Sequence, residues 1–514
     1  MPNPCSTTIL LTGATGLLGR YLMADLLDRD YELAVLARGN NFATALQRVE
    51  QAVADVEQFY CLPRPRVLQG ALDSVDLQMA SSDVEWLKTR NLIVVHCAAS
   101  IKFDRDQTGE PYRTNVDGTA NLLAFCKNLQ IDEFHYVSTA YVGCRTQNTT
   151  VFEKPVQLPE GAASVESKDS KLALNDYELS KIRSEAMVAE TPWLGKRVIH
   201  RPSIVVGDSR TSYTSTFHGF YAPLKIGAQY AAKYGFSREA GDWFRRQLGL
   251  ETDDSKNLVN VDWVARGIVK SVRTTAIRDN TIMHWTNPRP VACNEMQLAI
   301  VDSIREEYGS GQAEPTGIGE PQFTASATTE DVPTATDFKA SLNAYASYFG
   351  RDPCFDDTNR SRHFSDLQCP VVDYVAMKSL ADFALRTDFG WPRKPPQTHV
   401  SAAVCEALRR IPEIAYVGST RNYIILQTVG AGACEQMAYT ERGNGWIRCA
   451  SVPEGEPVRL KLPFVCLANC LTGDDDIVQV IRDGRALIHA SDHSVATKFI
   501  ANWVLYVKSM LVNY

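Results

Sequence analysis

Residues Thr8–Gly19 have the sequence TILLTGATGLLG, in which a short apolar run ends in three glycines spaced three residues apart. The run predicts a buried strand, and the apolar spacing of the following residues, Leu17–Asp28, predicts a helix. In such a strand–turn–helix unit Gly13 permits the tight turn, Gly16 lets the backbone approach a pyrophosphate, and Gly19 lets the helix pack against the strand. The free amides at the helix N-terminus favour phosphate groups. The stretch therefore predicts a dinucleotide-binding turn.

Short β-rich runs alternate with helical patterns downstream of this turn. Strands separated by helical segments predict a parallel sheet with helices on both faces, and uninterrupted apolar strands fit burial from both sides. The sequence therefore predicts an α/β fold with a Rossmann-type, doubly wound parallel sheet. The further expected strands are Tyr31–Ala37, Arg66–Gln69, Asn91–Cys97, Glu133–Ser138 and Lys196–Val206, and the next expected helix is Asn115–Leu129.

The composition of the remaining chain indicates two domains. Residues 308–334 are rich in Gly, Pro, Ser and Thr, which is typical of a long loop, and the proline-rich run 392–396 indicates a domain boundary. We therefore expect a first domain at 1–391 and a smaller C-terminal α+β domain at 397–514. Within the first domain we expect a Rossmann core at about 5–290 and a smaller substrate lobe at about 208–250 and 290–391.

The overall composition limits the partners and the compartment. The formal net charge of −7 and the lack of a Lys/Arg-rich block argue against nucleic acid or an anionic membrane as the main partner. The sequence lacks a stretch of about 20 apolar residues, so we expect no membrane span, and we see no secretion signal. The 13 cysteines are scattered through apolar surroundings, which is typical of reduced thiols in a cytoplasmic protein. No His or Cys spacing predicts a metal site.

Two arginines bear on which dinucleotide binds. Arg38 directly follows the second expected strand, where an acid binds the ribose 2′-hydroxyl and an arginine accommodates the 2′-phosphate. Arg38 therefore favours NADPH as the cofactor. Arg48 is a candidate second ligand of the phosphate, although its spacing fits a solvated helix face equally well.

A hydroxyl pair and a Tyr/Lys pair follow the dinucleotide unit. Ser138 and Thr139 come at the end of the fifth expected strand, and Tyr177 and Lys181 share one helical face. A neighbouring ammonium lowers the pKa of a tyrosine, so this pair is suited to protonate an oxygen as hydride arrives at its carbon. The hydroxyl of Thr139 is suited to bind the same oxygen. These residue types are common, and it is their order along the chain, after the glycine turn and Asn115, that favours a catalytic role for them.

With these motifs the chain resembles the extended short-chain dehydrogenase/reductases and, within them, the thioester reductases, which include the fatty acyl-CoA reductases of the male-sterility type. The resemblance spans roughly residues 8–290. It implies NADPH-dependent reduction of an acyl thioester, bound to CoA or to an acyl-carrier protein, to an aldehyde or onward to an alcohol. The resembling segments are TGATGLLGRYL, LARGNN, HCAASIKFD, TNVDGT, YVSTAYVG, YELSK, RPSIVVGDS and NLVNVDWVA.

The resemblance also implies a role for each matching residue. Thr139 and Tyr177 would hold the carbonyl oxygen, and Lys181 would hold the ribose and tune Tyr177. Asn115 would support the active-site helix and its water network. The implied cofactor-binding residues are Thr12, Gly13, Thr15, Gly16, Leu17, Leu18, Gly19, Arg38, Arg48, Leu72, Asp73, Ala98, Ala99, Asn115, Ser138, Tyr177, Lys181, Pro202 and Ser203.

Two positions depart from the family pattern. Relatives often carry Gly-Asp after the third strand, in contact with adenine, whereas this chain has Gly70-Ala71-Leu72-Asp73. Either Asp73 makes that contact through a shifted loop, or the contact is missing. Lys102 stands where a smaller polar residue is more usual, so it either adds positive charge for an anionic CoA or phosphopantetheine group or is a solvated lysine.

Several alternatives stay open. Another extended short-chain dehydrogenase/reductase, such as a hydroxysteroid dehydrogenase or a sugar-nucleotide epimerase, would use the same Tyr and Lys, and a non-catalytic NADPH-binding lipid carrier or regulator is a third alternative. Residues 213–234 form either part of a substrate lid or packed core helices. His200 and His218 are candidates, but core or surface histidines are more common. Residues 445–488 resemble the sterol carrier protein fold, so the C-terminal domain is either lipid-binding or an accessory domain, and an oligomer is compatible with the sequence.

Overall fold

The computed structural model describes most of residues 7–308, all of 352–390 and most of 411–511. The chain forms two compact units. The larger comprises Met1–Asp25, Ala34–Leu36 and Leu68–Arg393, and the smaller comprises Leu26–Leu33, Ala37–Val67 and Lys394–Tyr514. The expected loop at 308–334, beyond its first residue, and the proline-rich run 392–396 lie outside the described residues.

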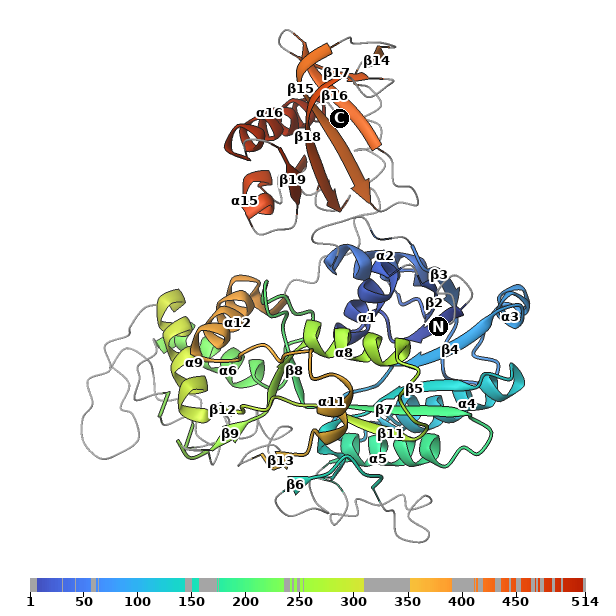
Figure 1. The fold of residues 1–514 in the computed structure, drawn as a ribbon. Helices are drawn as coiled ribbons and strands as arrows, with labels where there is room; N and C mark the ends of the chain where they lie inside the picture. Colours follow the sequence, from blue (N-terminus) through green and yellow to red (C-terminus); the bar gives the residue numbers. More distant parts are fainter. Residues whose placement is uncertain are drawn as a thin grey trace, which may run out of the picture. The chain divides into compact units, whose positions relative to one another are not determined.

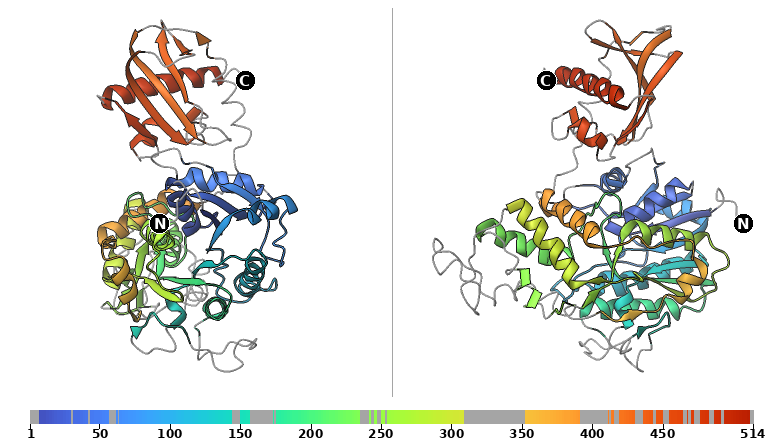
Figure 2. Two further views of the ribbon diagram at one scale, coloured as in Figure 1. Left: turned by 45° about the vertical axis from the view of Figure 1, so that its right-hand side comes forward. Right: turned by 60° about the vertical axis from the view of Figure 1, so that its left-hand side comes forward.

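A seven-stranded sheet with the order β11-β7-β5-β4-β1-β2-β3 organises the first part of the chain (Figure 1). The pairs β1–β4, β4–β5, β5–β7 and β7–β11 are parallel, and helices lie on both faces of the sheet (Figure 2). The predicted doubly wound α/β fold is therefore confirmed. The strands are β1 (Thr7–Thr12), β2 (Glu32–Ala37), β3 (Arg66–Gln69), β4 (Asn91–His96), β5 (Glu133–Val137), β7 (Lys196–Pro202) and β11 (Thr281–Trp285).

The strands are apolar because helices cover them from both sides. Leu10, Val94 and Phe134 are paired across three neighbouring strands, belong to one apolar cluster and are at most 1% exposed. Burial on both faces is what uninterrupted apolar strands require. The helices of this part are α1 (Leu17–Asp28), α2 (Ala45–Val56), α3 (Ser81–Lys88), α4 (Gly118–Asn128), α5 (Asp176–Ala189) and α8 (Val261–Arg273).

Three elements differ from the sequence-based expectation. The expected strand Lys196–Val206 is divided at Ser203 into β7 and β8 (Ile204–Val206), and β8 pairs with β10 (Leu258–Asn260) instead of continuing in the main sheet. The expected helix Asn115–Leu129 begins earlier, with a π-helical turn, η2 (Arg113–Asp117). Strand β11, which completes the sheet, was not predicted, because its sequence lies in a region without clear periodicity.

A smaller lobe is assembled from segments far apart in the sequence. The helices α6 (Tyr221–Tyr234), α9 (Cys293–Tyr308) and α12 (Tyr374–Arg386) share one apolar cluster that contains Leu224, Ile304 and Leu380. Residues 221–231 therefore supply core packing, one of the two expectations for residues 213–234. Two small sheets complete this part, formed by β9 (Ser255–Lys256) with β12 (Val291–Ala292) and by β6 (Thr150–Val151) with β13 (Cys354–Phe355).

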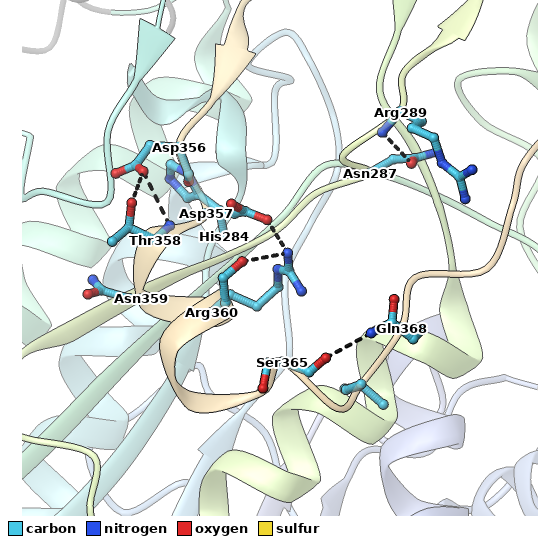
Figure 3. A network of polar contacts seen from close by, with 12 residues as sticks. His284, Asn287, Arg289, Asp356, Asp357, Thr358, Asn359, Arg360, Ser365 and Gln368 are labelled. Atoms are coloured by element: carbon cyan, nitrogen blue, oxygen red, sulfur yellow. Dashed lines mark hydrogen bonds and ion pairs between the residues drawn. The ribbon is translucent and has the colours of Figure 1, made fainter.

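A polar network joins residues 356–360 to β11. The Glu153 carboxylate accepts hydrogen bonds from the backbone N–H groups of His284 and Asn359. Asp356 accepts from the N–H and hydroxyl of Thr358 at the start of α11 (Thr358–His363), and its carbonyl contacts His284 Nδ1 at 2.6 Å (Figure 3). Burial raises the pKa of Glu153 to about 7 and lowers the pKa of His284 to about 3. The network therefore holds residues 356–360 against the edge of the main sheet.

The C-terminal part forms a separate α+β unit. Its six-stranded sheet has the order β14-β17-β16-β15-β18-β19, and Leu426, Leu460 and Trp503 are fully buried in its core. The α+β prediction is confirmed, whereas the likeness to sterol carrier proteins stays a prediction. The elements are β14 (Glu413–Ile414), β15 (Ser419–Val429), β16 (Gln436–Arg442), β17 (Gly445–Cys449), β18 (Glu454–Pro463), α15 (Ile477–Arg482), β19 (Leu487–His489) and α16 (His493–Leu511).

No helix within the described ranges combines the length and the apolar character needed to cross a membrane.

Candidate active site

The turn between β1 and α1 is closed by a hydrogen bond of 2.9 Å from the Gly16 N–H to the Gly13 carbonyl. Gly13 has a φ of +76°, and a Cβ there would lie 2.5 Å from the backbone nitrogen of Ala98. A Cβ at Gly19 would overlap the Gly13 carbonyl. The turn therefore requires glycine at both positions. The first amides of α1 have no partner within the helix, which is the arrangement that binds a pyrophosphate.

A cavity of about 370 Å³ opens against this turn. Its volume is within the usual range for small-molecule sites. The glycine turn lines one side, and the ends of β5 and β7 and the start of α5 line another. The sequence-predicted residues that line it are Gly13, Gly16, Leu17, Leu18, Gly19, Ala99, Ser138, Thr139, Tyr177, Lys181, Pro202 and Ser203.

The start of α5 presents Tyr177 to the cavity. Asn175 caps the helix by accepting a hydrogen bond of 2.9 Å from the Glu178 N–H, as expected for an Asn at this position. The Asp176 N–H donates to the Phe103 carbonyl at 2.9 Å, and the Phe103 ring meets the Tyr177 ring edge-on at 6.2 Å between centroids. These contacts fix the first turn of α5 and with it the phenol.

The Tyr177 phenol is a weaker acid than the sequence predicted. Burial raises its pKa above the ordinary value, and the charge of Glu178 raises it further. Lys181 Nζ donates to the Val137 carbonyl at 2.6 Å and lies 4.4 Å from the Tyr136 ring centre, and burial lowers its pKa to about 8. The expectation that Lys181 lowers the pKa of Tyr177 is therefore wrong in this structure, where the phenol stays protonated at neutral pH.

Three hydroxyls meet the cavity where two neighbouring strands end. Ser138 and Thr139 follow β5, and Ser203 follows β7; they are 3%, 6% and 6% exposed. Within the described part of the chain, Ser138 Oγ and Ser203 Oγ have no hydrogen-bond partner. Buried hydroxyls without a partner are costly in free energy. Both are therefore placed to bind polar atoms of a ligand.

Asn115 acts on α5 from outside the cavity lining. Its side-chain N–H groups donate to Ser180 Oγ at 2.8 Å and to the Ser100 carbonyl at 2.9 Å. Its own backbone carbonyl, in the π-helical turn, accepts from Ser184 Oγ at 2.7 Å. Since Ser180 and Ser184 belong to α5, these contacts fit the expected role of Asn115 in supporting the helix that carries Tyr177.

Four predicted cofactor residues are absent from the cavity lining but belong to the backbone around it. Thr12 is buried, and its hydroxyl contacts His96 Nδ1 at 2.6 Å and accepts from the Ala98 N–H at 3.2 Å, which ties β1 to β4. The Thr15 carbonyl accepts from the Arg20 guanidinium at 2.9 Å. The Leu72 carbonyl accepts from a side chain of α4. These contacts tie Thr12, Ala98, Thr15 and Leu72 into the backbone, and their cofactor-binding role stays a prediction.

The two departures from the family pattern lie at exposed positions. Asp73 is exposed and does not line the cavity. Lys102 is exposed, forms an ion pair with Asp106 and does not line the cavity, so both of its expected roles stay predictions. The structure therefore leaves the predicted adenine contact of Asp73 untested.

Arg38 and Arg48 lie together after β2. The Arg48 guanidinium donates to the Arg38 carbonyl at 2.6 Å, and burial together with the charge of Arg38 lowers the pKa of Arg48. Two cations held this close favour an anion beside them. Neither residue lines the cavity of 370 Å³.

Sequence reasoning assigned no role to much of the cavity wall. Some of these residues lie inside segments that already carried the resemblance, HCAASIKFD and YVSTAYVG, so their neighbourhood was a signal. Ile204 and Val205 lie in the resembling segment RPSIVVGDS, and Thr216, His218 and Gly219 fall within residues 213–234, for which a substrate lid was one of the two expectations. The unassigned lining residues are Cys97, Ile101, Phe103, Val137, Tyr141, Ile204, Val205, Thr216, His218 and Gly219.

The glycine turn and the Thr139, Tyr177 and Lys181 side chains at one cavity define a dinucleotide-binding domain of the Rossmann type, with hydroxyl and ammonium groups beside the dinucleotide site. The sequence matches the male sterility protein family of NAD-binding domains over residues 11–268, half of the chain. The chain belongs to this family, and its cofactor is accordingly a nicotinamide dinucleotide.

Two curated relatives are similar to about half of this chain. The chain is 27% identical over 315 residues to fatty acyl-CoA reductase 2 of Bos taurus, covering 56% of this chain and 59% of that protein. It is 26% identical over 280 residues to fatty acyl-CoA reductase 1 of Xenopus laevis, covering 50% and 52%. The chain thus spans between half and three fifths of the length of these relatives.

The fold is similar to that of the terminal R domain of the myxalamid PKS-NRPS pathway, with a TM-score of 0.57 and 22% identity over 76% of this chain and 93% of that domain. It is also similar to a thiolation-reductase di-domain of an archaeal non-ribosomal peptide synthetase, with a TM-score of 0.51 and 17% identity over 75% of this chain and 76% of that structure. At these identities the likeness shows the shared fold.

Proposed function

We propose that this chain is an NADPH-dependent reductase of fatty acyl thioesters carried by CoA or by an acyl-carrier protein. The observation that carries the proposal is the cavity in which the glycine turn meets Thr139, Tyr177 and Lys181. The relatives named as fatty acyl-CoA reductases support the choice of substrate.

The residues present fit a nicotinamide dinucleotide. Gly13 and Gly19 pack too closely against backbone to carry a Cβ, which brings the turn and the start of α1 to the cavity where a pyrophosphate would bind. The unpartnered hydroxyls of Ser138 and Ser203 can bind polar groups of the ring end. Arg38 and Arg48 support the choice of NADPH over NADH, because a 2′-phosphate would compensate their charges. When bound, NADPH supplies the hydride that the carbonyl carbon accepts.

The side chains of this site would stabilise the reacting oxygen. The Tyr177 phenol, protonated at neutral pH, and the Thr139 hydroxyl donate hydrogen bonds to the thioester oxygen as negative charge develops on it. The carbon gains a hydride and the oxygen takes the Tyr177 proton. As the C–S bond breaks, the oxygen returns this proton to Tyr177 and forms the aldehyde C=O, and the sulfur leaves as a thiolate that takes a proton from solvent. Lys181 orients the cofactor ribose beside Tyr177.

The outer wall of the cavity suits an acyl chain. Ile101, Phe103, Ile204 and Val205 contribute apolar side chains to the lining, and apolar surface in a concave site favours an aliphatic ligand. The hydroxyls of a sugar nucleotide would gain no hydrogen-bond partner from these four side chains. The wall therefore favours the thioester reductase over the sugar-nucleotide epimerase alternative.

The decisive experiment follows NADPH absorbance with a panel of acyl-CoA and acyl-pantetheine thioesters, together with product analysis by gas chromatography. We expect NADPH consumption with long-chain acyl thioesters and the appearance of the matching aldehyde or alcohol. The ratio of NADPH consumed to thiol released separates aldehyde from alcohol as the end product. If the protein bound NADPH but turned over no thioester of any chain length, the thioester proposal would be lost.

A further inference from the structure

The loop between β8 and α6 forms part of the substrate side of the cavity. Thr216, His218 and Gly219 from this loop line the cavity. The loop begins with a turn in which Asp208 accepts hydrogen bonds from the N–H groups of Arg210 and Thr211. Its shape is therefore defined at the start, just before the residues that meet the substrate.

Arg20 is hydrogen-bonded to the glycine turn. This arginine follows the third glycine of the motif and is only 7% exposed. Its guanidinium donates to the carbonyls of Thr15 at 2.9 Å and Gly16 at 3.3 Å. Because those carbonyls belong to the turn whose amides face the cavity, the position of the Arg20 side chain depends on the conformation of the turn.

Tyr213 connects these two features. Arg20 Nη1 donates to the Tyr213 hydroxyl at 2.5 Å, and the guanidinium carbon lies 5.9 Å from the centre of the Tyr213 ring. The Tyr213 ring also meets the Phe383 ring of α12 edge-on, at 5.9 Å between centroids. The adjacent Ser212 hydroxyl is hydrogen-bonded at 2.8 Å to Ser379, also in α12. The loop is thus attached both to the glycine turn and to the smaller lobe.

We propose that Tyr213 is a positioning residue that couples the glycine turn to the substrate wall, through Arg20. A pyrophosphate bound at the turn fixes the carbonyls that hold Arg20, Arg20 fixes the Tyr213 hydroxyl, and the loop with Thr216 and His218 is held in the shape that receives the acyl chain. The cofactor therefore orders the wall against which the thioester lies. This inference rests on the proposed dinucleotide binding but not on the identity of the thioester.

The test compares hydrogen–deuterium exchange of the full chain with and without NADP⁺, which binds without any reaction. In the wild-type protein we expect NADP⁺ to slow amide exchange in both residues 13–19 and residues 207–220, by about fivefold or more. In Tyr213→Phe, which keeps the ring contacts and loses the hydroxyl, residues 13–19 should stay protected while the slowing in 207–220 falls below about twofold.

The matched control is Tyr221→Phe. The Tyr221 hydroxyl also binds this region, accepting from the Gly207 N–H at 3.1 Å, but it does not contact Arg20. We expect this variant to keep the protection of residues 207–220 by NADP⁺. With palmitoyl-CoA, Tyr213→Phe should raise KM about five- to tenfold and leave kcat within about twofold. The substitution removes the ordering of the substrate wall but leaves the reacting groups in place.

Protection of residues 207–220 that persists in Tyr213→Phe would overturn the inference, and so would a wild-type protein in which NADP⁺ protects only residues 13–19. If NADP⁺ protected neither region, dinucleotide binding itself would be lost along with the inference. If both regions were protected as expected but no thioester reacted, the coupling would stand and only the proposed substrate would fall.

Discussion

The two sides of the cavity are built in different ways. The motif side consists of the glycine turn, the ends of β5 and β7 and the start of α5, and its residues belong to short segments with recognisable spacing. The loop side consists of residues 204–219, in which Tyr213 and Ser212 contact Phe383 and Ser379 of α12. The motif side can therefore be recognised locally, whereas the loop side depends on contacts across the whole first unit.

The difference indicates that residues on the motif side take part in the reaction, whereas residues on the loop side select the substrate. Backbone geometry and proton chemistry fix the motif side, because few residues allow a φ of +76° or donate a proton to an oxygen. The loop side needs only apolar surface of the right shape, which many sequences can supply. Substitutions should accordingly change kcat on the motif side and KM on the loop side.

The largest effect is expected for Tyr177→Phe on the motif side. Loss of the phenol hydroxyl should reduce kcat by about 10²- to 10⁴-fold, since it removes the proton donor. The Kd of NADPH, measured by fluorescence titration, should change by less than about twofold. If turnover were unchanged, Tyr177 would not be the proton donor. The assignment of catalysis to the motif side would then lose its basis.

A second large effect concerns the sheet beneath the motif side. His96, His135, His200 and His284 lie on four neighbouring strands, and burial lowers the pKa of each. In the unfolded chain they bind protons below about pH 6.5, and in the folded chain they do not. The free energy of unfolding should therefore fall as the pH drops below 6.5, by up to about 1.4 kcal/mol per pH unit for each histidine.

Glu153 acts in the opposite direction. Its pKa is raised to about 7, so its contribution to stability is fully present below its unfolded pKa of about 4.3 and is lost as the pH rises through 7. Because four histidines oppose one carboxyl, the free energy of unfolding should still fall as the pH drops. Thermal melting between pH 5 and 8 measures it, and a Tm that rises toward pH 5 would contradict the expectation.

The preference for NADPH over NADH should depend on Arg38 and Arg48, which follow β2. The double variant Arg38→Ala/Arg48→Ala is expected to raise KM for NADPH by about 10- to 100-fold, because hydrogen bonds to a charged phosphate are lost, and to leave KM for NADH nearly unchanged. Arg64→Ala serves as the control, since Arg64 pairs with Glu50 in the same part of the chain. Equal losses with both dinucleotides would argue against binding of a 2′-phosphate.

The smallest effect is expected where Asp352 supports the cavity wall through Tyr141. Tyr141 lines the cavity, and its hydroxyl donates to Asp352 at 2.7 Å, which also forms an ion pair with Lys256 at 3.0 Å. Tyr141→Phe should raise KM for the acyl thioester by about two- to tenfold, with kcat nearly unchanged. Tyr374→Phe, which loses a similar bond to Asp302 away from the cavity, is the control. If only kcat fell, Tyr141 would take part in the reaction instead of shaping the substrate wall.

Much of the fold was predictable from local patterns, and the failures have physical causes. The strands that precede residue 140 are apolar and bounded by turns, so their periodicity predicted them. The break between β7 and β8 at Ser203 was not predictable, because the Ser203 N–H is satisfied by the Trp285 carbonyl of a strand more than 80 residues away. The prediction that Lys181 lowers the pKa of Tyr177 was wrong, because spacing on a helix does not reveal that Lys181 donates to the Val137 carbonyl.

The sequence by itself determined the dinucleotide turn, the parallel sheet and the Thr139, Tyr177 and Lys181 set, because glycine conformations, apolar strands and helical spacing are properties of a few consecutive residues. Only the tertiary structure decided the protonation of Tyr177, the composition of the apolar wall and the link from Arg20 to Tyr213. Those depend on burial and on partners distant in sequence, and no local pattern encodes the free energy of a contact between segments that meet only after folding.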